Sequence, residues 1–110
     1  MKRIETIVPQ SEKSKVIEVF EQLGLNFTHY DTRGRGKNPP VTVELHRGTG
    51  TMREVFNENA TILTVVADSM TDKVVEKILN NTYGGEGIVF VYEVKDAIDI
   101  KSKKRGDSIL

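Results

Sequence analysis

Two glycine-rich turns are the segments of this chain best suited to binding a phosphate group. One reads Gly34-Arg-Gly-Lys37 and the other Gly84-Gly-Glu-Gly87. Glycine lets backbone N–H groups approach an anion closely, because it adopts unusual dihedral angles and adds no side-chain bulk. Arg35, Lys37 and Lys101 could supply cations. Neither turn matches the P-loop or the dinucleotide fingerprint, so both could also be plain turns that bind no ligand.

The histidines and acidic residues form no catalytic or metal-binding pattern. His46 lies beside Arg47 and Gly48 without a serine–acid relay or a metal cluster. His29 has no ligand-type neighbour and is interpreted as an ordinary strand residue. The chain has no cysteine, which excludes disulfides and thiolate metal sites. We therefore expect a protein that is not an enzyme and that holds neither a metal nor a catalytic cofactor.

The length and charge of the chain limit its class. Its 110 residues predict a single domain over residues 1–110. The 16 basic and 16 acidic residues cancel, which argues against nucleic-acid binding. No apolar run approaches the roughly 20 residues of a membrane span, and the first residues lack the apolar core of a signal peptide. A cytoplasmic protein is expected, and its small aliphatic core favours oligomerisation.

The hydrophobic patterns predict four strands and two helices. The strands are expected over residues 2–9, 25–33, 60–68 and 88–92, where β-branched residues are dense. The helices follow the first and third strands, with apolar stripes from Val16 and from Val74. Ser11 is expected to cap the first helix, Ser69 or Thr71 the second, and Gly24 to end the first. A short edge strand could follow at 97–100.

A long connection separates the second and third strands. It spans about 20 residues, and connections this long inside a small domain are usually functional or disordered. One interpretation is an arm that contacts a ligand or a partner. The other is a hairpin, because residues 41–45 alternate like a short strand. The element order predicts an α+β fold: a ferredoxin-like βαββαβ sandwich, with two helices over an antiparallel sheet and a long loop between strands 2 and 3.

The sequence resembles the PII signalling proteins over nearly its full length. MKRIETIVP is similar to the first strand of that family, and Thr32-Arg-Gly-Arg-Gly-Lys37 to its strand-to-T-loop junction. His46-Arg-Gly48 resembles Tyr-Arg-Gly of its T-loop, and Gly85-Glu-Gly87-Ile-Val-Phe-Val91 resembles Gly-Asp-Gly-Lys-Ile-Phe-Val of its B-loop. Asp96-Ala-Ile-Asp-Ile-Lys101 and the last residues resemble its C-terminal segment.

The resemblance implies a homotrimer that binds an adenine nucleotide (ADP, ATP or AMP) in clefts between subunits. A T-loop over about residues 37–59 would regulate a target protein, such as a membrane transporter or a metabolic enzyme. The C-terminal segment would cover about residues 96–110. By matching position, the nucleotide-binding residues would be Thr28, Gly34, Arg35, Gly36, Lys37, Val65, Gly85, Glu86, Gly87 and Lys101. The partner-binding residues would be His46, Arg47, Gly48 and Thr51.

Several positions depart from the family pattern. Ile88 stands at the B-loop lysine, and Asp99 and Lys101 stand at the two C-terminal arginines. Losing two cations and gaining an anion should weaken triphosphate binding, since charge-assisted contacts to phosphate are the strong ones. Asn38 and Asn59 stand where the family contacts 2-oxoglutarate, and Thr51 aligns with its modified tyrosine. We therefore expect a divergent member that prefers fewer phosphates. The alternative is a binding module that responds to another small anion or has lost nucleotide binding.

Overall fold

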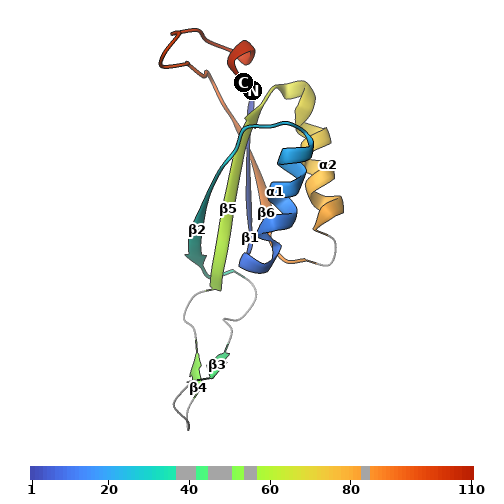
Figure 1. The fold of residues 1–110 in the computed structure, drawn as a ribbon, viewed down its shortest axis with the longest axis vertical. Helices are drawn as coiled ribbons and strands as arrows, with labels where there is room; N and C mark the ends of the chain where they lie inside the picture. The colour runs from blue at the N-terminus through green and yellow to red at the C-terminus, as the bar shows by residue number, and fades with distance from the viewer. Residues whose placement is uncertain (37–41, 45–50, 54–56, 83–84) are drawn as a thin grey trace.

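A four-stranded antiparallel sheet in the order β2-β5-β1-β6 forms the centre of the molecule (Figure 1). The computed structural model describes residues 1–36, 42–44, 51–53, 57–82 and 85–110. The main elements run in the order β1 (Lys2–Pro9), α1 (Lys13–Gln22), β2 (Thr28–Gly34), β5 (Asn57–Val66), α2 (Thr71–Asn81) and β6 (Ile88–Glu93). The predicted ferredoxin-like α+β fold is thereby confirmed.

Both helices cover one face of the sheet, and the core lies between them and that face (Figure 1). Residues 4, 6 and 8 of β1 are buried while their neighbours are not, as the alternation of the sequence predicts. From α1 and α2, the largest contributions are Phe20 and Ile78, which are both fully buried. The other buried apolar residues are Ile4, Val8, Val16, Val19, Ala60, Ile62, Val66 and Val74.

The opposite face of the sheet carries apolar and aromatic side chains, and none of the described helices or strands covers them. The register places Phe90 beside Glu5 and Tyr92 beside Arg3, and both aromatic residues are more than 40% exposed. The Arg3 guanidinium lies 5.1 Å from the centroid of the Tyr92 ring and 2.5 Å from a Glu5 carboxylate oxygen. We call this surface the open face.

The starts of the helices differ from the prediction. A single 3₁₀ turn precedes each helix, η1 (Gln10–Glu12) before α1 and η2 (Asp68–Met70) before α2. Neither helix has a side-chain hydrogen bond at its N-cap, so Ser11 and Ser69 are not caps. The 3₁₀ turn leads the chain directly from the strand into the helix. Gly24 does end α1 as predicted, with φ +65 and a hydrogen bond from the Leu25 amide to the Phe20 carbonyl.

Two strand limits also differ. β2 begins at Thr28 rather than Leu25, because Leu25 completes the end of α1. β5 begins at Asn57, where it pairs with Gly34 at the end of β2. The polar residues at the start of β5 carry no apolar pattern, so only their pairing with β2, and at Asn59 also with β1, identifies them as a strand.

A separate hairpin and a C-terminal turn lie outside the sheet. β3 (Thr42–Glu44) pairs with β4 (Thr51–Arg53), so the short strand expected at 41–45 forms over residues 42–44. The interpretation of the connection as an arm that contacts a ligand or a partner stays a prediction. Beyond β6, the strand expected at 97–100 is reduced to one bridge between Ile98 and Arg105. The chain ends in η3 (Asp107–Ile109). In the part of the chain that the structure describes, no helix is long and apolar enough to span a bilayer.

Candidate functional site

The first glycine turn continues from the edge strand β2. Gly34 is the last residue of that strand and pairs with Asn57, while Arg35 and Gly36 follow as exposed residues. Thr28 begins the same strand. It pairs with Leu63, two residues before Val65 on β5, so Thr28 and Val65 lie on the open face as diagonal neighbours. Lys37 lies outside the described residues.

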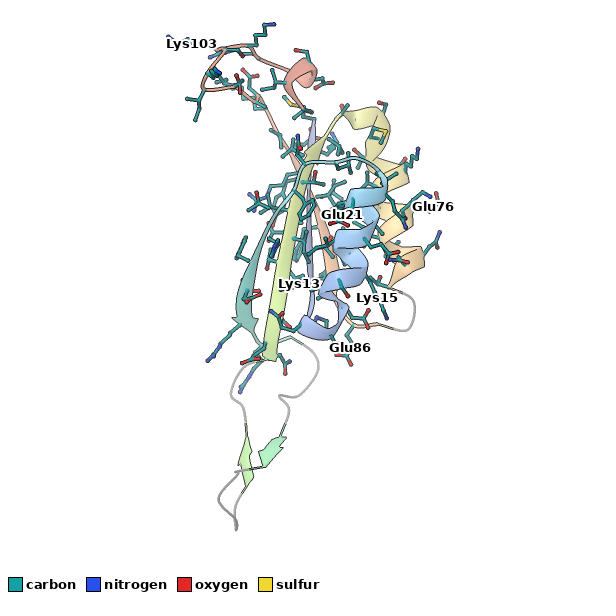
Figure 2. The ribbon with its side chains drawn as sticks, viewed as in Figure 1. Lys13, Lys15, Glu21, Glu76, Glu86 and Lys103 are labelled. Atoms are coloured by element: carbon teal, nitrogen blue, oxygen red, sulfur yellow. The ribbon has the colours of Figure 1, made fainter. Side chains whose placement is uncertain are left out.

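The second glycine turn leads into the other edge strand, β6. Gly87 has φ +143, and a Cβ atom there would lie 2.6 Å from the Ile7 carbonyl oxygen and 2.8 Å from Val8 Cγ1. Only glycine fits this position, because the backbone approaches the end of β1 so closely. The Gly85 amide donates to the Thr82 carbonyl over 2.9 Å. Glu86 is exposed at this end of the sheet (Figure 2).

The two glycine turns lie at the same end of the sheet but at opposite edges. Ile7 pairs with Ile88 on one side of β1, and Gly34 pairs with Asn57 at the start of β5. Because β5 and β1 separate the edge strands, and adjacent strands lie about 4.8 Å apart, the turns are about 14 Å apart across the sheet. One copy of the chain therefore does not bring them into one cleft.

Lys101 belongs to the opposite end of the molecule. β6 starts beside Ile7 and ends at Glu93 beside Lys2, so the segment after it emerges at the end of the sheet far from both glycine turns (Figure 1). Lys101 is exposed there. The predicted nucleotide-binding residues thus fall into three groups: the β2 edge with its neighbour Val65, the turn before β6, and the C-terminal segment.

A polar cluster ties η1 and the start of α1 to the two strands that lead into the connection between β2 and β5. The Gln10 amide nitrogen donates to Asp31 Oδ1 over 2.8 Å and to the Asn59 carbonyl oxygen over 2.7 Å. Lys13 Nζ lies 3.7 Å from the same Asp31 oxygen. The hydrogen bond from Gln10, followed by the charge of Lys13, lowers the pKa of the Asp31 carboxyl.

The sequence pattern did not predict this polar cluster. Gln10 is a lone polar residue after Pro9, and no spacing relates it to Asp31 or Asn59 before the strand register is known. Of the predicted partner-binding residues, His46, Arg47 and Gly48 lie outside the described residues. Thr51 is the first residue of β4.

The described residues were also compared with the requirements of a metal site and of a ligand-binding groove. Across residues 1–36, 57–82 and 85–110, no three histidine or acidic side chains gather as a metal site would require. A polar groove of 360 Å³ lies between α1 and α2 and is lined by Val19, Gln22, Lys73, Glu76, Lys77, Asn80 and Asn81. None of the residues predicted from the sequence lines this groove.

Comparison with known proteins gives one consistent result. Residues 1–104 match the family model described as nitrogen regulatory protein P-II. The chain is 30% identical to a nitrogen regulatory protein P-II of Rhodospirillum rubrum over 96% of each chain. It is 29% identical to proteins of the same name from Haemophilus influenzae and Pasteurella multocida, each over the full length of both chains.

Proposed function

This chain belongs to the P-II family of nitrogen regulatory proteins, and from that premise we propose a specific mode of action. The protein is a homotrimer that binds an adenine nucleotide in clefts between subunits. Through its T-loop it regulates a target protein, such as a transporter or a metabolic enzyme. It acts as a regulator rather than as an enzyme, and its predicted cytoplasmic location stays a prediction.

The placement of the two glycine turns at opposite sheet edges supports the intersubunit cleft best. A site that uses both turns needs the β2 edge of one copy beside the β6 edge of the next. Such a head-to-tail contact uses two different surfaces, and it closes into a ring when the rotation fits. The apolar side chains of the open face favour the same association. Tyr30 on β2 and Ile88 on β6 are 44% and 49% exposed in the single chain.

Each group of residues has a distinct role in this proposal. Gly34, Arg35, Gly36 and Lys37 form one wall of the cleft, and Thr28 and Val65 lie by the adenine. Gly85, Glu86 and Gly87 form the phosphate-facing turn, where glycine lets the backbone approach without side-chain obstruction. Lys101 adds a cation. Because Lys101 lies at the far end of its own sheet, it serves a cleft formed with another copy.

Calorimetry with ADP, ATP and AMP, combined with sedimentation, tests the proposal. We expect a mass near that of a trimer. We also expect saturable nucleotide binding with a lower affinity for ATP than for the nucleotides with fewer phosphates. Arg35→Ala and Lys101→Ala should each remove a cation and weaken binding without changing the sedimenting mass. A monomer that binds no nucleotide would overturn the proposal. Tight binding of Mg-ATP that depends on 2-oxoglutarate would overturn the assignment as a divergent member.

A second function is a trimeric binding module that responds to another small anion or has lost its nucleotide. The exposure of Ile88, which is 49% at the first position of β6, favours it. An isoleucine there adds no charge beside the phosphate-facing turn, where the family has a lysine. The discriminating measurement is capture of the target by the trimer with and without nucleotide. Target capture that is the same with and without nucleotide supports the binding module. Target capture that depends on nucleotide supports the main proposal.

The T-loop residues His46, Arg47, Gly48 and Thr51 are proposed to contact the target. The cluster of Gln10, Asp31 and Asn59 supports this role, because it holds the two strands that lead into the loop against η1, the turn before α1. Arg47→Ala should abolish capture of the target while nucleotide affinity stays unchanged. If the variant captures the target as well as the wild type does, the T-loop surface has been assigned wrongly.

A further inference from the structure

The short turn η1 makes contacts toward both edges of the sheet, at the end where the two glycine turns lie. Its first residue, Gln10, bonds to Asp31 on the edge strand β2 and to the Asn59 carbonyl on β5. Its last residue, Glu12, packs against Gly85 in the turn before β6. Because η1 is a single 3₁₀ turn of three residues, it holds these two sets of contacts at a nearly fixed separation.

The Glu12 carboxylate lies directly against the backbone of the turn before β6. A Cβ atom added to Gly85 would lie 3.2 Å from Glu12 Cδ and 3.4 Å from Glu12 Oε1. The same atom would lie 2.9 Å from the Thr82 carbonyl oxygen, which accepts the hydrogen bond from the Gly85 amide. No side chain of Gly85 separates the carboxylate from the turn, so a movement of one displaces the other.

The same carboxylate is shielded from water. The Glu12 side chain is 16% exposed, and its Oε2 atom is buried without a hydrogen bond in the described part of the chain. Lys15 Nζ donates to Oε1 over 3.4 Å and lies 3.1 Å from Oε2 as an ion pair. Little water screens a carboxylate in this position, so negative charge brought close to it raises its energy more than it would at an exposed site.

At its other end, η1 is bonded to the two strands that lead into the T-loop. The Gln10 side-chain amide has two hydrogens, and it donates to both Asp31 Oδ1 and the Asn59 carbonyl oxygen. Asn59 pairs with Thr32, two residues before Gly34 ends β2. A shift of η1 therefore acts on both strands within three residues of the connection between them.

We propose that η1 couples the phosphate-facing turn of residues 85–87 to the T-loop, with Glu12 and Gln10 as the two positioning residues. Phosphate at the turn repels the Glu12 carboxylate, so bound nucleotide favours a position of η1 in which the carboxylate lies farther from the turn. Such a difference in interaction energy is what a ligand-driven change requires. Gln10 then transmits the shift to β2 and β5. This inference deepens the proposed function and rests on it.

Amide hydrogen exchange with and without saturating ADP tests the coupling. The readout is the peptide over residues 57–60, at the start of β5, because the proposed cleft does not include these residues. ADP should change its exchange rate in the wild type at least about twofold. Gln10→Ala should abolish that change while calorimetry gives an ADP affinity close to that of the wild type. The matched control is Gln22→Ala, which removes an amide bond to Glu18 within α1 and should keep the change.

Substitution of Glu12 tests the charge at the other end of η1. Glu12→Gln keeps the length of the side chain and removes its charge. It should bind ADP at least about twofold more tightly, because the repulsion is gone, and it should lose the ADP-dependent change in exchange over residues 57–60. Glu21→Gln removes a charge from an exposed position further along α1, away from Glu86 (Figure 2), and should alter neither quantity.

The remaining outcomes separate this inference from the proposed function. An unchanged sedimenting mass and urea midpoint for Gln10→Ala and Glu12→Gln show that both variants keep the fold and the assembly. If the wild type binds ADP without any change over residues 57–60, or if Gln10→Ala retains the full change, the coupling through η1 is wrong. Weaker ADP binding by Glu12→Gln would contradict it as well. A wild type that binds none of ADP, ATP and AMP overturns the proposed function, and the inference with it.

Discussion

Gly24 and Gly87 both have a positive φ, but their surroundings differ. Gly24 ends α1 with φ +65 in open space, so only its backbone conformation favours glycine. Gly87 combines φ +143 with a backbone contact, because a Cβ atom would lie 2.6 Å from the Ile7 carbonyl oxygen. The carbonyl belongs to a central strand that pairs on both sides and has little freedom to move.

Alanine at these glycines should therefore have unequal effects. Gly24→Ala is expected to cost about 1 kcal/mol of unfolding free energy, the penalty of a left-handed conformation alone. Gly87→Ala should cost at least about 2 kcal/mol, because strained conformation and collision add. Urea unfolding of both variants checks the order. Equal costs would mean that the turn before β6 relaxes away from β1.

The pKa of Asp31 gives a second prediction for single residues. Its folded value lies below the ordinary 3.8, first because of the Gln10 hydrogen bond and then because of Lys13. A lowered folded pKa stabilises the protein above the ordinary value, and this stabilisation is lost as the pH falls through the folded pKa. In NMR titrations, Gln10→Ala should raise the pKa of Asp31 more than Lys13→Gln does. The reverse order would show that charge, rather than the hydrogen bond, dominates.

At the level of elements, apolar periodicity predicted which faces are buried but not where each helix starts. Ile4, Thr6 and Val8 alternate in the sequence and in the sheet, because the pleat turns alternate side chains to the core. Ser11 looks like a cap, yet it lies within η1 and makes no cap bond. The geometry of a strand-to-helix connection depends on the packing of both elements, which a single polar residue does not reveal.

The α1 face of the core should be sensitive to truncation. Phe20 is fully buried and its ring centroid lies 5.8 Å from that of Phe27. Phe20→Ala is expected to lower the unfolding free energy by about 3–5 kcal/mol, the usual cost of removing a buried aromatic side chain. Leu79→Ala, at a position 58% exposed on α2, should cost about 0.5 kcal/mol or less. Denaturant unfolding of the two variants provides the comparison.

For the molecule as a whole, the sequence shows the motifs but not how far apart they lie in the folded chain. Gly34 and Gly87 both carry recognisable turns, and only the strand order β2-β5-β1-β6 shows that they lie at opposite edges. The site of Lys101 at the other end of the sheet was equally hidden, because it depends on the direction of β6. The hydrogen bond that the Asp99 carboxylate accepts from the Ser102 amide was also hidden, because it depends on the conformation of the turn.

If the trimer assembles through the open face, a charged residue introduced there should disrupt the trimer, whereas one on the helix side should not. Phe90 and Tyr92 are 41% and 43% exposed in the single chain, so Phe90→Asp should leave the subunit folded. In the trimer the new carboxylate would be buried against neighbouring copies, and an unpaired buried charge is costly. Sedimentation should show dissociation for Phe90→Asp and none for Leu79→Asp on the helix side. A Phe90→Asp variant that stays trimeric would exclude the open face from the interface.

The two unpaired edges of the sheet have a consequence for the abundance of the protein. Strands β2 and β6 each have a partner on one side only, and a bare edge can pair with whatever strand it meets. If copies cover these edges in one another, dilution uncovers them, and the apparent melting temperature rises with protein concentration. A cell that makes too little of this chain would then lose it to proteolysis and aggregation faster than its synthesis rate alone implies.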